Sequence, residues 1–391
     1  MSSERGSKLY VSRATVDTTY GFVPEQGLPG KIQELPVEKF QAKTPEEFKD
    51  IEDELTDRGI RFVSTVGGNG VNMLHRNLAV NKHRQEPELL IARTWVGSDN
   101  FRALLEEDLG QPGVEKKITE YDGDTPRSII IPRMTKKKGK EEKDVLDRTI
   151  VSNQPTGLES EFASHIPDNA TYAVINSLGG DDWHTSLTDG VRLLKQKDIP
   201  YAYTPGSPQL KTIADGTDRE KIDAAYEAIA GARTLNIDLG ELKKLIKGKD
   251  KAIEVDDLPI TTLLDHGLDM GQDDKFTLFV TDGADGSFAA TKDKDQRTQK
   301  VWVSSMPVKE VVSTAGAGDA YASIAIDHYM RTGDMVESAR RGSASGAFAV
   351  EYLGAHENPA TNEQIDTRLR QTPPEMLELQ GAREQLIYSA H

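Results

Sequence analysis

Short apolar runs alternate with longer segments of helical spacing along most of this chain, and this alternation restricts the possible folds more than any other feature. The runs at 89–92 and 172–176 are each followed by a helical pattern, at about 99–109 and 185–197. Strands separated by helices of this length indicate a parallel sheet covered on both faces. We therefore expect a doubly wound, mostly parallel α/β fold with its site at the carboxyl ends of the strands. The other expected elements are strands at 199–203, 233–236, 276–281 and 308–312 and helices at 43–59 and 223–230.

Two regions interrupt this alternation. Residues 8–40 are rich in turn-forming residues, and residues 117–152 alternate in the manner of β-strands. We expect these two segments to form a small β-sheet that covers the site as a lid. Residues 41–116 and 153–391 would then form the α/β core of a single domain that includes the whole chain, 1–391.

The composition excludes several classes of function. The 391 residues include no cysteine, which excludes disulfides, thiolate metal sites and cysteine nucleophiles. The formal net charge of −16 disfavours binding to nucleic acid. No run approaches the roughly 18 apolar residues of a membrane helix, and the N-terminus has no apolar leader, so we expect a cytoplasmic protein without a membrane partner. The charged run at 136–144 is interpreted as a solvated hairpin tip, with attraction of phosphate as the alternative.

The segment 313–326 carries the most information about chemistry, because a strand expected to end near Val312 is followed by small residues and then by an apolar helix. Small residues at 315–318 would leave backbone N–H groups exposed at a helix N-terminus, which is an arrangement that binds anions. Asp319 follows them directly. A carboxylate here would repel a phosphate in a simple binding site, but it would serve as a base for an attacking hydroxyl. The alternative is that Asp319 only caps the helix.

The same segment resembles the Asp-Thr-x-Gly-Ala-Gly-Asp signature of the ribokinase-like (PfkB) carbohydrate kinase family, with Ser313 in place of the first aspartate. The resemblance implies a ribokinase-like fold and an ATP-dependent phosphotransferase that acts on an alcohol group of a carbohydrate, with Asp319 as general base. Ser313 would remove any assistance that the first carboxylate gives to metal or phosphate. The resemblance assigns Thr314 and Ala315 to the nucleotide, and assigns the amides of Ala315, Gly316, Ala317 and Gly318 to an anion hole.

Three further positions carry the substrate contacts that the resemblance implies. The segment 66–72 resembles the family's Gly-Gly-x-x-x-Asn motif, in which the glycines let a sugar approach the backbone and the asparagine binds its hydroxyls. Asp17 stands where the family's first strand ends in a substrate-binding aspartate. Arg148 resembles an Arg-Thr element near the substrate, although a surface arginine on a hairpin strand explains it equally well. The motif positions are Gly67, Gly68 and Asn72.

Two segments resemble the family's magnesium and nucleotide elements. Asn236 lies five residues before Glu241, and Asp238 lies three before it, so the spacing departs from the family's Asn-x-x-Glu. Glu241 is the candidate for the magnesium shell, with Asp238 in place of the asparagine. The segment 280–286 resembles the Thr-x-Gly-x-x-Gly turn near the nucleotide, although a plain hairpin would give the same string. Its matching positions are Thr281, Gly283 and Gly286.

Other interpretations stay open at the level of sequence. A nucleoside kinase of the same fold differs only in its acceptor pocket, and a catalytically silent nucleotide- or sugar-binding homologue would explain Ser313 and the altered spacing at 236–241. Neither a Walker phosphate loop nor a complete Rossmann glycine fingerprint is present. The resemblance further implies that two copies associate as a homodimer through the lid.

Overall fold

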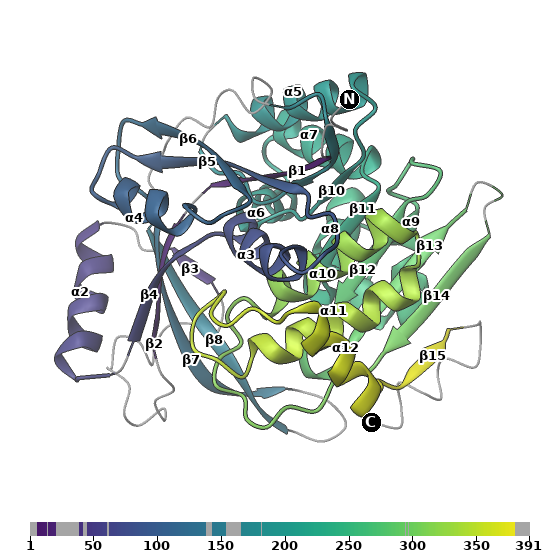
Figure 1. Cartoon of the computed structure of the whole chain (residues 1–391). Helices are drawn as coiled ribbons and strands as arrows, with labels where there is room; N and C mark the ends of the chain where they lie inside the picture. Colours follow the sequence, from purple (N-terminus) through teal and green to yellow (C-terminus); the bar gives the residue numbers. More distant parts are fainter. Residues whose placement is uncertain are drawn as a thin grey trace.

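The structure is a computed structural model that describes residues 6–13, 15–20, 39–41, 45–60, 62–137, 143–153, 166–180, 182–293, 295 and 297–379. These residues form a ten-stranded sheet, a separate five-stranded sheet and the helices that pack on both (Figure 1). The predicted α/β fold with a second, smaller sheet is therefore confirmed.

The large sheet is parallel over most of its width and has the strand order β15-β14-β13-β12-β11-β10-β9-β1-β5-β6. Its parallel strands are β6 (Val114–Tyr121), β5 (Leu89–Gly97), β1 (Ser7–Arg13), β9 (Ala170–Ile175), β10 (Tyr201–Tyr203), β11 (Thr234–Asp238) and β12 (Thr277–Thr281). Antiparallel pairing adds β13 (Ser287–Lys292), β14 (Thr298–Val303) and β15 (Met376–Glu378) at one edge. Because β1 lies between β5 and β9, the strand order reverses there, and ligands of such sheets bind at this switch point.

Alternating side chains on the strands build a core on each face of the large sheet. In β1, Leu9 and Val11 join one core and Tyr10 joins the other. The first face is covered by α5 (Trp183–Gln196), α6 (Ser207–Asp215), α7 (Arg219–Ala230), α8 (Leu239–Lys249) and α9 (Ile260–Leu268). The opposite face is covered by α3 (Asn69–Asn81), α4 (Phe101–Asp108) and α10 (Ala317–Thr332), with α11 (Met335–Ala349) and α12 (Asn362–Gln371) packed beside them.

The small sheet has the order β3-β8-β7-β2-β4 and a core of its own. Its strands are β3 (Lys39–Gln41), β8 (Lys143–Asn153), β7 (Arg127–Lys137), β2 (Thr15–Tyr20) and β4 (Phe62–Gly67). The expected helix at 43–59 is α2 (Pro45–Asp57), which packs Phe48, Ile51 and Leu55 on this sheet. Figure 1 shows α2 at the periphery of the molecule, beside the small sheet.

The boundaries expected for the lid need correction. Strand β1, inside the expected lid segment 8–40, belongs to the large sheet, and β4, inside the expected core segment 41–116, pairs with β2 in the small sheet. Strand β1 is buried on both faces, as a central parallel strand must be, and the turn-rich residues after it obscured this signal. Residues 21–38 and the hairpin tip 138–142 lie outside the described residues.

The strand expected at 308–312 is also wrong. This segment is a loop in which the N–H groups of Val312 and Ser313 donate to the carbonyl oxygen of Val350, at 2.8 and 3.2 Å. Val308 packs against the cluster formed by α3, α10, α11 and α12, whereas Val311 is exposed. Val308 therefore packs on helices, and the segment does not extend the sheet.

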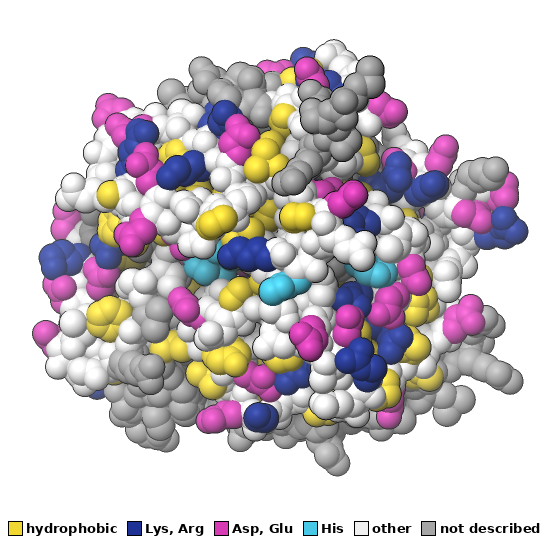
Figure 2. All heavy atoms as spheres, in the orientation of Figure 1, with side chains coloured by type: hydrophobic (Ala, Val, Ile, Leu, Met, Phe, Trp, Pro, Cys, Tyr) yellow, Lys and Arg dark blue, Asp and Glu magenta, His cyan; other side chains and the backbone are white. Residues whose placement is uncertain are grey.

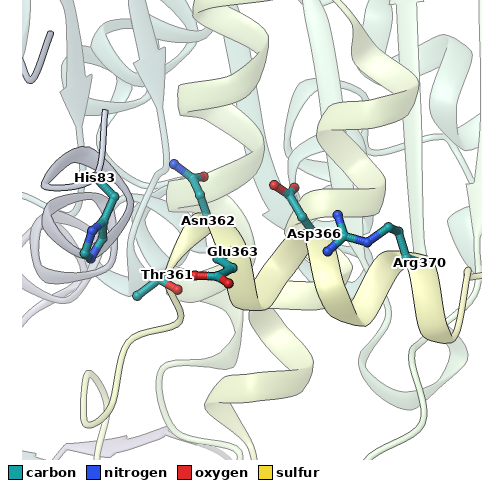
Figure 3. A pocket seen from close by; sticks show the side chains of 6 residues that line it. All are labelled: His83, Thr361, Asn362, Glu363, Asp366 and Arg370. Atoms are coloured by element: carbon teal, nitrogen blue, oxygen red, sulfur yellow. The ribbon is translucent and has the colours of Figure 1, made fainter. Parts of the chain in front are cut away.

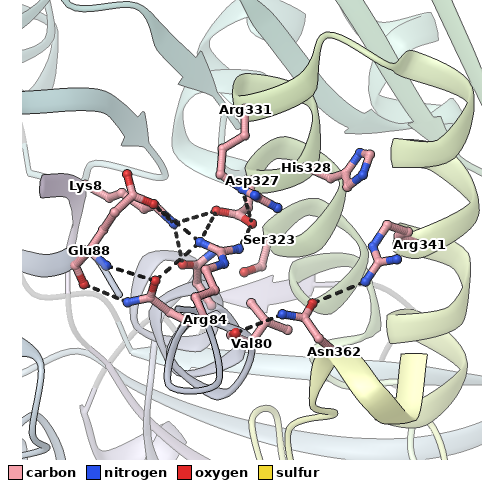
Figure 4. A network of polar contacts seen from close by, with 12 residues as sticks. Lys8, Val80, Arg84, Glu88, Ser323, Asp327, His328, Arg331, Arg341 and Asn362 are labelled. Carbon is pink, nitrogen blue, oxygen red and sulfur yellow. Dashed lines mark hydrogen bonds and ion pairs between the residues drawn. The ribbon is translucent and has the colours of Figure 1, made fainter. Parts of the chain in front are cut away.

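A buried network of charges joins the middle of α10 to the sheet (Figure 4). Asp327 accepts hydrogen bonds from Lys8 Nζ at 2.6 Å and from the Tyr172 hydroxyl at 2.9 Å, and it pairs with Arg84 and Arg331. Burial alone would disfavour the charged carboxylate, but Lys8 and Arg84 outweigh it and hold the pKa of Asp327 well below its usual range. The network fixes the position of the helix that begins at the candidate site.

The surface mixes both signs of charge. On the face that Figure 2 shows, acidic and basic side chains are interspersed, and hydrophobic side chains form small separate groups. Among the helices of the described residues, none combines the length and apolar character needed to cross a membrane.

Candidate active site

The turn at the start of α10 has a backbone conformation and a close contact that favour glycine. Gly316, the N-terminal cap, has φ 74°, in the left-handed region. A Cβ atom added to Gly316 would lie 2.1 Å from the carbonyl oxygen of Ala355. By contrast, a Cβ atom on Gly318 would meet nothing within 4 Å. The loop 354–356 therefore packs tightly on one side of this turn, while the other side faces open space.

The backbone N–H groups of 315–318 are not equivalent. The N–H of Ala315 donates to Ser313 Oγ at 3.1 Å, and the N–H of Ala317 donates to the Thr314 carbonyl at 3.3 Å. The N–H groups of Gly316 and Gly318 have no acceptor among the described residues. This geometry narrows the expected anion hole to these two glycines. It also explains Ser313, whose hydroxyl closes the turn that precedes the helix.

The carboxylate of Asp319 is held by two asparagines from another helix. Asn69 Nδ2 donates to Asp319 Oδ1 at 2.9 Å, and Asn72 Nδ2 donates to Asp319 Oδ2 at 2.8 Å. Both asparagines lie in the first turn of α3, about 250 residues away in the chain. Asp319 is half-buried, and α3 packs on α10. Asn72 was expected at the site, whereas Asn69 occupies a free position of the motif and was not.

Arg76, one turn beyond Asn72, was also missed. It is 1% exposed, and Nη2 donates to the Ala355 carbonyl at 3.0 Å, while Nε and Nη1 have no hydrogen-bond partner among the described residues. Burial lowers the pKa of Arg76 to about 10, although the negative charges of Asp319 and Glu357 act in the opposite direction. A buried cation therefore lies in the field of Asp319.

Three of the expected substrate residues come together where β4 meets α3. Gly68 caps α3 with φ 94°. A Cβ atom on Gly67 would lie 1.9 Å from Asp17 Oδ2, so the Asp17 carboxylate rests against the backbone at Gly67. Asp17 lies on β2 of the small sheet and accepts a hydrogen bond from Thr15 Oγ1 at 2.9 Å. Arg148 lies in β8 opposite Pro132, and its side chain is outside the described part of the chain.

A row of buried polar residues crosses the carboxyl ends of three central strands. Asn176 follows β9, Thr204 follows β10 and Asn236 lies in β11, and the strand register makes them neighbours. The Asn176 side chain, Thr204 Oγ1 and Asn236 Oδ1 are buried and have no partner among the described residues. Asn176 lies under α3, because a Cβ atom on Gly70 would be 3.0 Å from its Nδ2. Isolated polar residues carry little sequence signal, so only the register reveals this row.

Three of the expected nucleotide residues lie at a hairpin turn, whereas Thr314 and Ala315 precede α10. Thr281 ends β12, and Gly283–Asp285 forms a short 3-10 turn before β13. Gly283 is exposed with φ 57°, whereas Gly286 is buried with φ 100°. A Cβ atom on Gly286 would lie 2.3 Å from the Val303 carbonyl oxygen, so this glycine is required by the hairpin itself.

The two expected metal-shell residues cap a helix. Asp238 Oδ1 accepts the Glu241 N–H at 2.7 Å, and Glu241 Oε2 accepts the Asp238 N–H at 3.0 Å, which is a capping box at the start of α8. Asp238 is paired with Thr281 in the sheet, so the expected metal shell and nucleotide turn are adjacent. Carboxylate oxygens at a strand end fit Mg²⁺, which prefers oxygen ligands.

A hollow of about 390 Å³ lies elsewhere, at α12 (Figure 3). It shares no residue with the expected site. Asp366 is paired with Arg341, and Asn362 Nδ2 donates to the Val80 carbonyl at 2.9 Å, so part of its polar lining is already used. Its lining residues are His83, Thr361, Asn362, Glu363, Asp366 and Arg370.

Solved structures share this fold over nearly the whole chain. A putative ribokinase II from E. coli aligns with a TM-score of 0.63 and 15% identity, covering 93% of this chain and 99% of that one. Ribokinase from Arabidopsis thaliana, complexed with ribose and ATP, gives a TM-score of 0.58, 14% identity and coverage of 94% and 99%. The Methanocaldococcus jannaschii nucleoside kinase gives a TM-score of 0.55, 17% identity and coverage of 94% and 98%. The ribokinase-like fold is thereby shown.

Comparison of the sequence with known proteins identifies a relative and a family. A nucleoside kinase of M. jannaschii is 32% identical over 92 residues, which cover 24% of this chain and 29% of that protein. The profile of the pfkB family of carbohydrate kinases matches residues 39–362. That match includes Asp319, the two asparagines that hold it and the turn of Gly316, so the chain belongs to the pfkB family of carbohydrate kinases.

Proposed function

We propose that this protein transfers the γ-phosphoryl group of ATP to a hydroxyl group of a sugar, with Asp319 as general base. One observation carries the proposal. Asp319 lies in the first turn of α10, where the N–H groups of Gly316 and Gly318 have no acceptor among the described residues, and its carboxylate is oriented by Asn69 and Asn72. A base placed beside unused donors at a helix N-terminus is the arrangement that phosphoryl transfer to an alcohol needs.

The proton and charge movements follow from these positions. As the acceptor oxygen bonds to the γ-phosphorus, its proton passes to the Asp319 carboxylate, and the bond to the bridging oxygen breaks to release ADP. Asn69 and Asn72 donate to different oxygens of this carboxylate and would fix its orientation for the proton transfer. The N–H groups of Gly316 and Gly318 would stabilise the negative charge on the transferring group.

The remaining expected residues fit roles around this centre. The acceptor would bind near Asp17, Gly67 and Gly68, with Arg148 as a further proposed contact, and the small sheet would act as a lid through which two copies could associate. The Thr281–Gly286 turn would support the nucleotide. Asp238 and Glu241 would hold Mg²⁺, which would supply positive charge to offset that of the nucleotide phosphates.

A nucleoside kinase is the second candidate. The observation that favours it is the local match to the nucleoside kinase of M. jannaschii. The sugar proposal is preferred because the motif at 66–72 is nearer to the sugar-kinase pattern and because the family profile is that of carbohydrate kinases.

The test is a turnover assay with ATP and Mg²⁺ against panels of sugars and nucleosides, with the phosphorylated product identified by mass spectrometry. We expect a phosphorylated sugar and an equal amount of ADP. A phosphorylated nucleoside would favour the second candidate. ATP binding without phosphorylation of any acceptor would contradict both and favour a silent binding protein.

A further inference from the structure

Two histidines and an aspartate meet behind the candidate site. His75 lies on α3, Asp108 is the last residue of α4, and His356 lies in the loop between α11 and α12. His75 Nε2 is 2.7 Å from Asp108 Oδ2, and His356 Nε2 is 3.8 Å from Asp108 Oδ1. The two imidazole rings stack with their centroids 4.4 Å apart. The side chains of His75, Asp108 and His356 are 12%, 22% and 9% exposed, respectively, so the cluster is mostly buried but in contact with solvent.

The hydrogen bonds of the site determine which nitrogen of His356 carries a proton. The Asp319 carboxylate can only accept, so Asn72 must turn its Nδ2 toward Asp319 and its Oδ1 toward His356. His356 Nδ1 lies 3.0 Å from that oxygen and must therefore donate its hydrogen to it. In neutral His356 the proton is then on Nδ1, and Nε2 presents a lone pair.

That lone pair faces a negative charge. His356 Nε2 is directed at the Asp108 carboxylate and lies 3.8 Å from Oδ1. Two acceptors that face each other at this distance repel unless a cation or a donor such as water lies between them. His75 Nε2 is directed at the other oxygen of the same carboxylate. The cluster is therefore built around a point that favours positive charge.

We propose that His75, Asp108 and His356 bind a divalent transition-metal ion, with Zn²⁺ as the representative case. The ligands are His75 Nε2, His356 Nε2 and a carboxylate oxygen of Asp108, and these atoms all lie within 4.8 Å of one another. Zn²⁺ places tetrahedral N and O ligands roughly 3.3 Å apart. The separations of 2.7 and 3.8 Å lie on either side of that value. The imidazole rings are 9° from parallel, so they would tilt out of their stack on binding to direct both lone pairs at one ion. Water would complete the coordination.

The two imidazole nitrogens among the ligand atoms determine which metal ions the cluster would favour. Imidazole nitrogens suit Zn²⁺ and its neighbours in the first transition row, whereas Mg²⁺ and Ca²⁺ prefer oxygen. The hydrogen bond from His356 Nδ1 to Asn72 is the outer contact that metal-binding histidines typically make, because it fixes the ring and its tautomer. Through Asn72 the ion would also steady the carboxylate of Asp319. This site is separate from the proposed Mg²⁺ position near Asp238 and Glu241.

The experiment uses the full-length protein without an affinity tag, stripped of metal by a chelator and titrated with Zn²⁺ in the absence of nucleotide. We expect one equivalent to bind, to raise the melting temperature and to resist displacement by excess Mg²⁺. Co²⁺ in its place should give the visible absorption of a nitrogen- and oxygen-ligated site. Asp108→Asn and His356→Ala should each weaken Zn²⁺ binding by more than the roughly 10–100-fold typical of losing an outer contact.

The matched control is His83→Ala, which removes an exposed histidine just beyond the end of α3. It should bind Zn²⁺ as the wild type does. The proposal is wrong if no Zn²⁺ binds in a stoichiometric amount, in which case a shared proton is the cation at this point, or if the Asp108→Asn and His83→Ala proteins bind it equally well. Metal binding is read without ATP or acceptor, so a failure of the proposed kinase activity would leave this result intact.

Discussion

Asp319 and Asp327 lie on the same helix, α10, in contrasting surroundings. Asp319 is half-buried and accepts hydrogen bonds from two neutral amides. Asp327 is 3% exposed and is surrounded by Lys8, Arg84, Arg331 and the hydroxyl of Tyr172. A carboxylate enclosed by cations is stabilised as a permanent anion and serves as an anchor. One that is half-buried and oriented by neutral amides is not held as a permanent anion in this way and can take a proton.

The sharpest test of this contrast is the exchange of each aspartate for asparagine. Asp319→Asn keeps the shape of the side chain and one of its two accepting oxygens, but it replaces the other oxygen by an NH2 donor and removes the base. We expect kcat to fall by about 10²–10⁴-fold, the usual contribution of general base catalysis, with ATP affinity and thermal stability little changed. Steady-state kinetics and calorimetric ATP titration would measure these. A near-normal kcat would show that Asp319 acts only as a cap.

Asp327→Asn should give the opposite result. Removing one partner of a buried ion pair typically costs about 3–5 kcal/mol, and here it would leave Lys8, which is fully buried, with less compensation. Urea unfolding followed by circular dichroism would measure the free energy of unfolding. Asp53→Asn is the control, because its pair with Lys49 is exposed and should contribute little. Equal losses in the two variants would refute the anchoring role.

The pH dependence separates the two aspartates further. Because the folded-state pKa of Asp327 is depressed, its contribution to stability is complete above the unfolded-state pKa of about 3.9 and is lost as the pH falls toward the lower folded-state value. The gap in unfolding free energy between wild type and Asp327→Asn should thus be constant from pH 7 to about 5 and narrow below about 4. Urea midpoints across this range would measure it. A gap that narrows already at neutral pH would contradict the assignment.

The smallest effect is expected from the glycines that precede Asp319. Gly316→Ala must adopt a positive φ and meet the Ala355 carbonyl, so it should destabilise the protein by more than about 1 kcal/mol. Gly318→Ala is the matched control for stability, because its Cβ atom would meet open space and its φ is not in the left-handed region. Thermal unfolding of both proteins measures the difference. Similar melting temperatures of the two variants would show that the loop 354–356 shifts at little cost in free energy.

Much of the fold was predictable from the sequence, because strands and helices produce local patterns of apolar residues. Runs that are apolar on both faces indicated the parallel strands, and the intervening helical spacing indicated the layers that cover them. The lid boundaries were misplaced because β1 and β2 follow each other almost directly yet enter different sheets. The apolar residues at 308–312 were misassigned because packing on helices and pairing in a sheet call for the same composition.

Sequence alone predicted the alternation of strands and helices in the α/β core, the glycine turn before α10 and the carboxylate that follows it, because these depend on backbone conformation and on neighbours in the chain. Packing of distant segments brings Asn69 and Asn72 to Asp319, aligns Asn176, Thr204 and Asn236 in a row, and brings His75, Asp108 and His356 together. Contacts between residues up to about 280 positions apart leave no periodic signal, since they arise from how strands and helices pack.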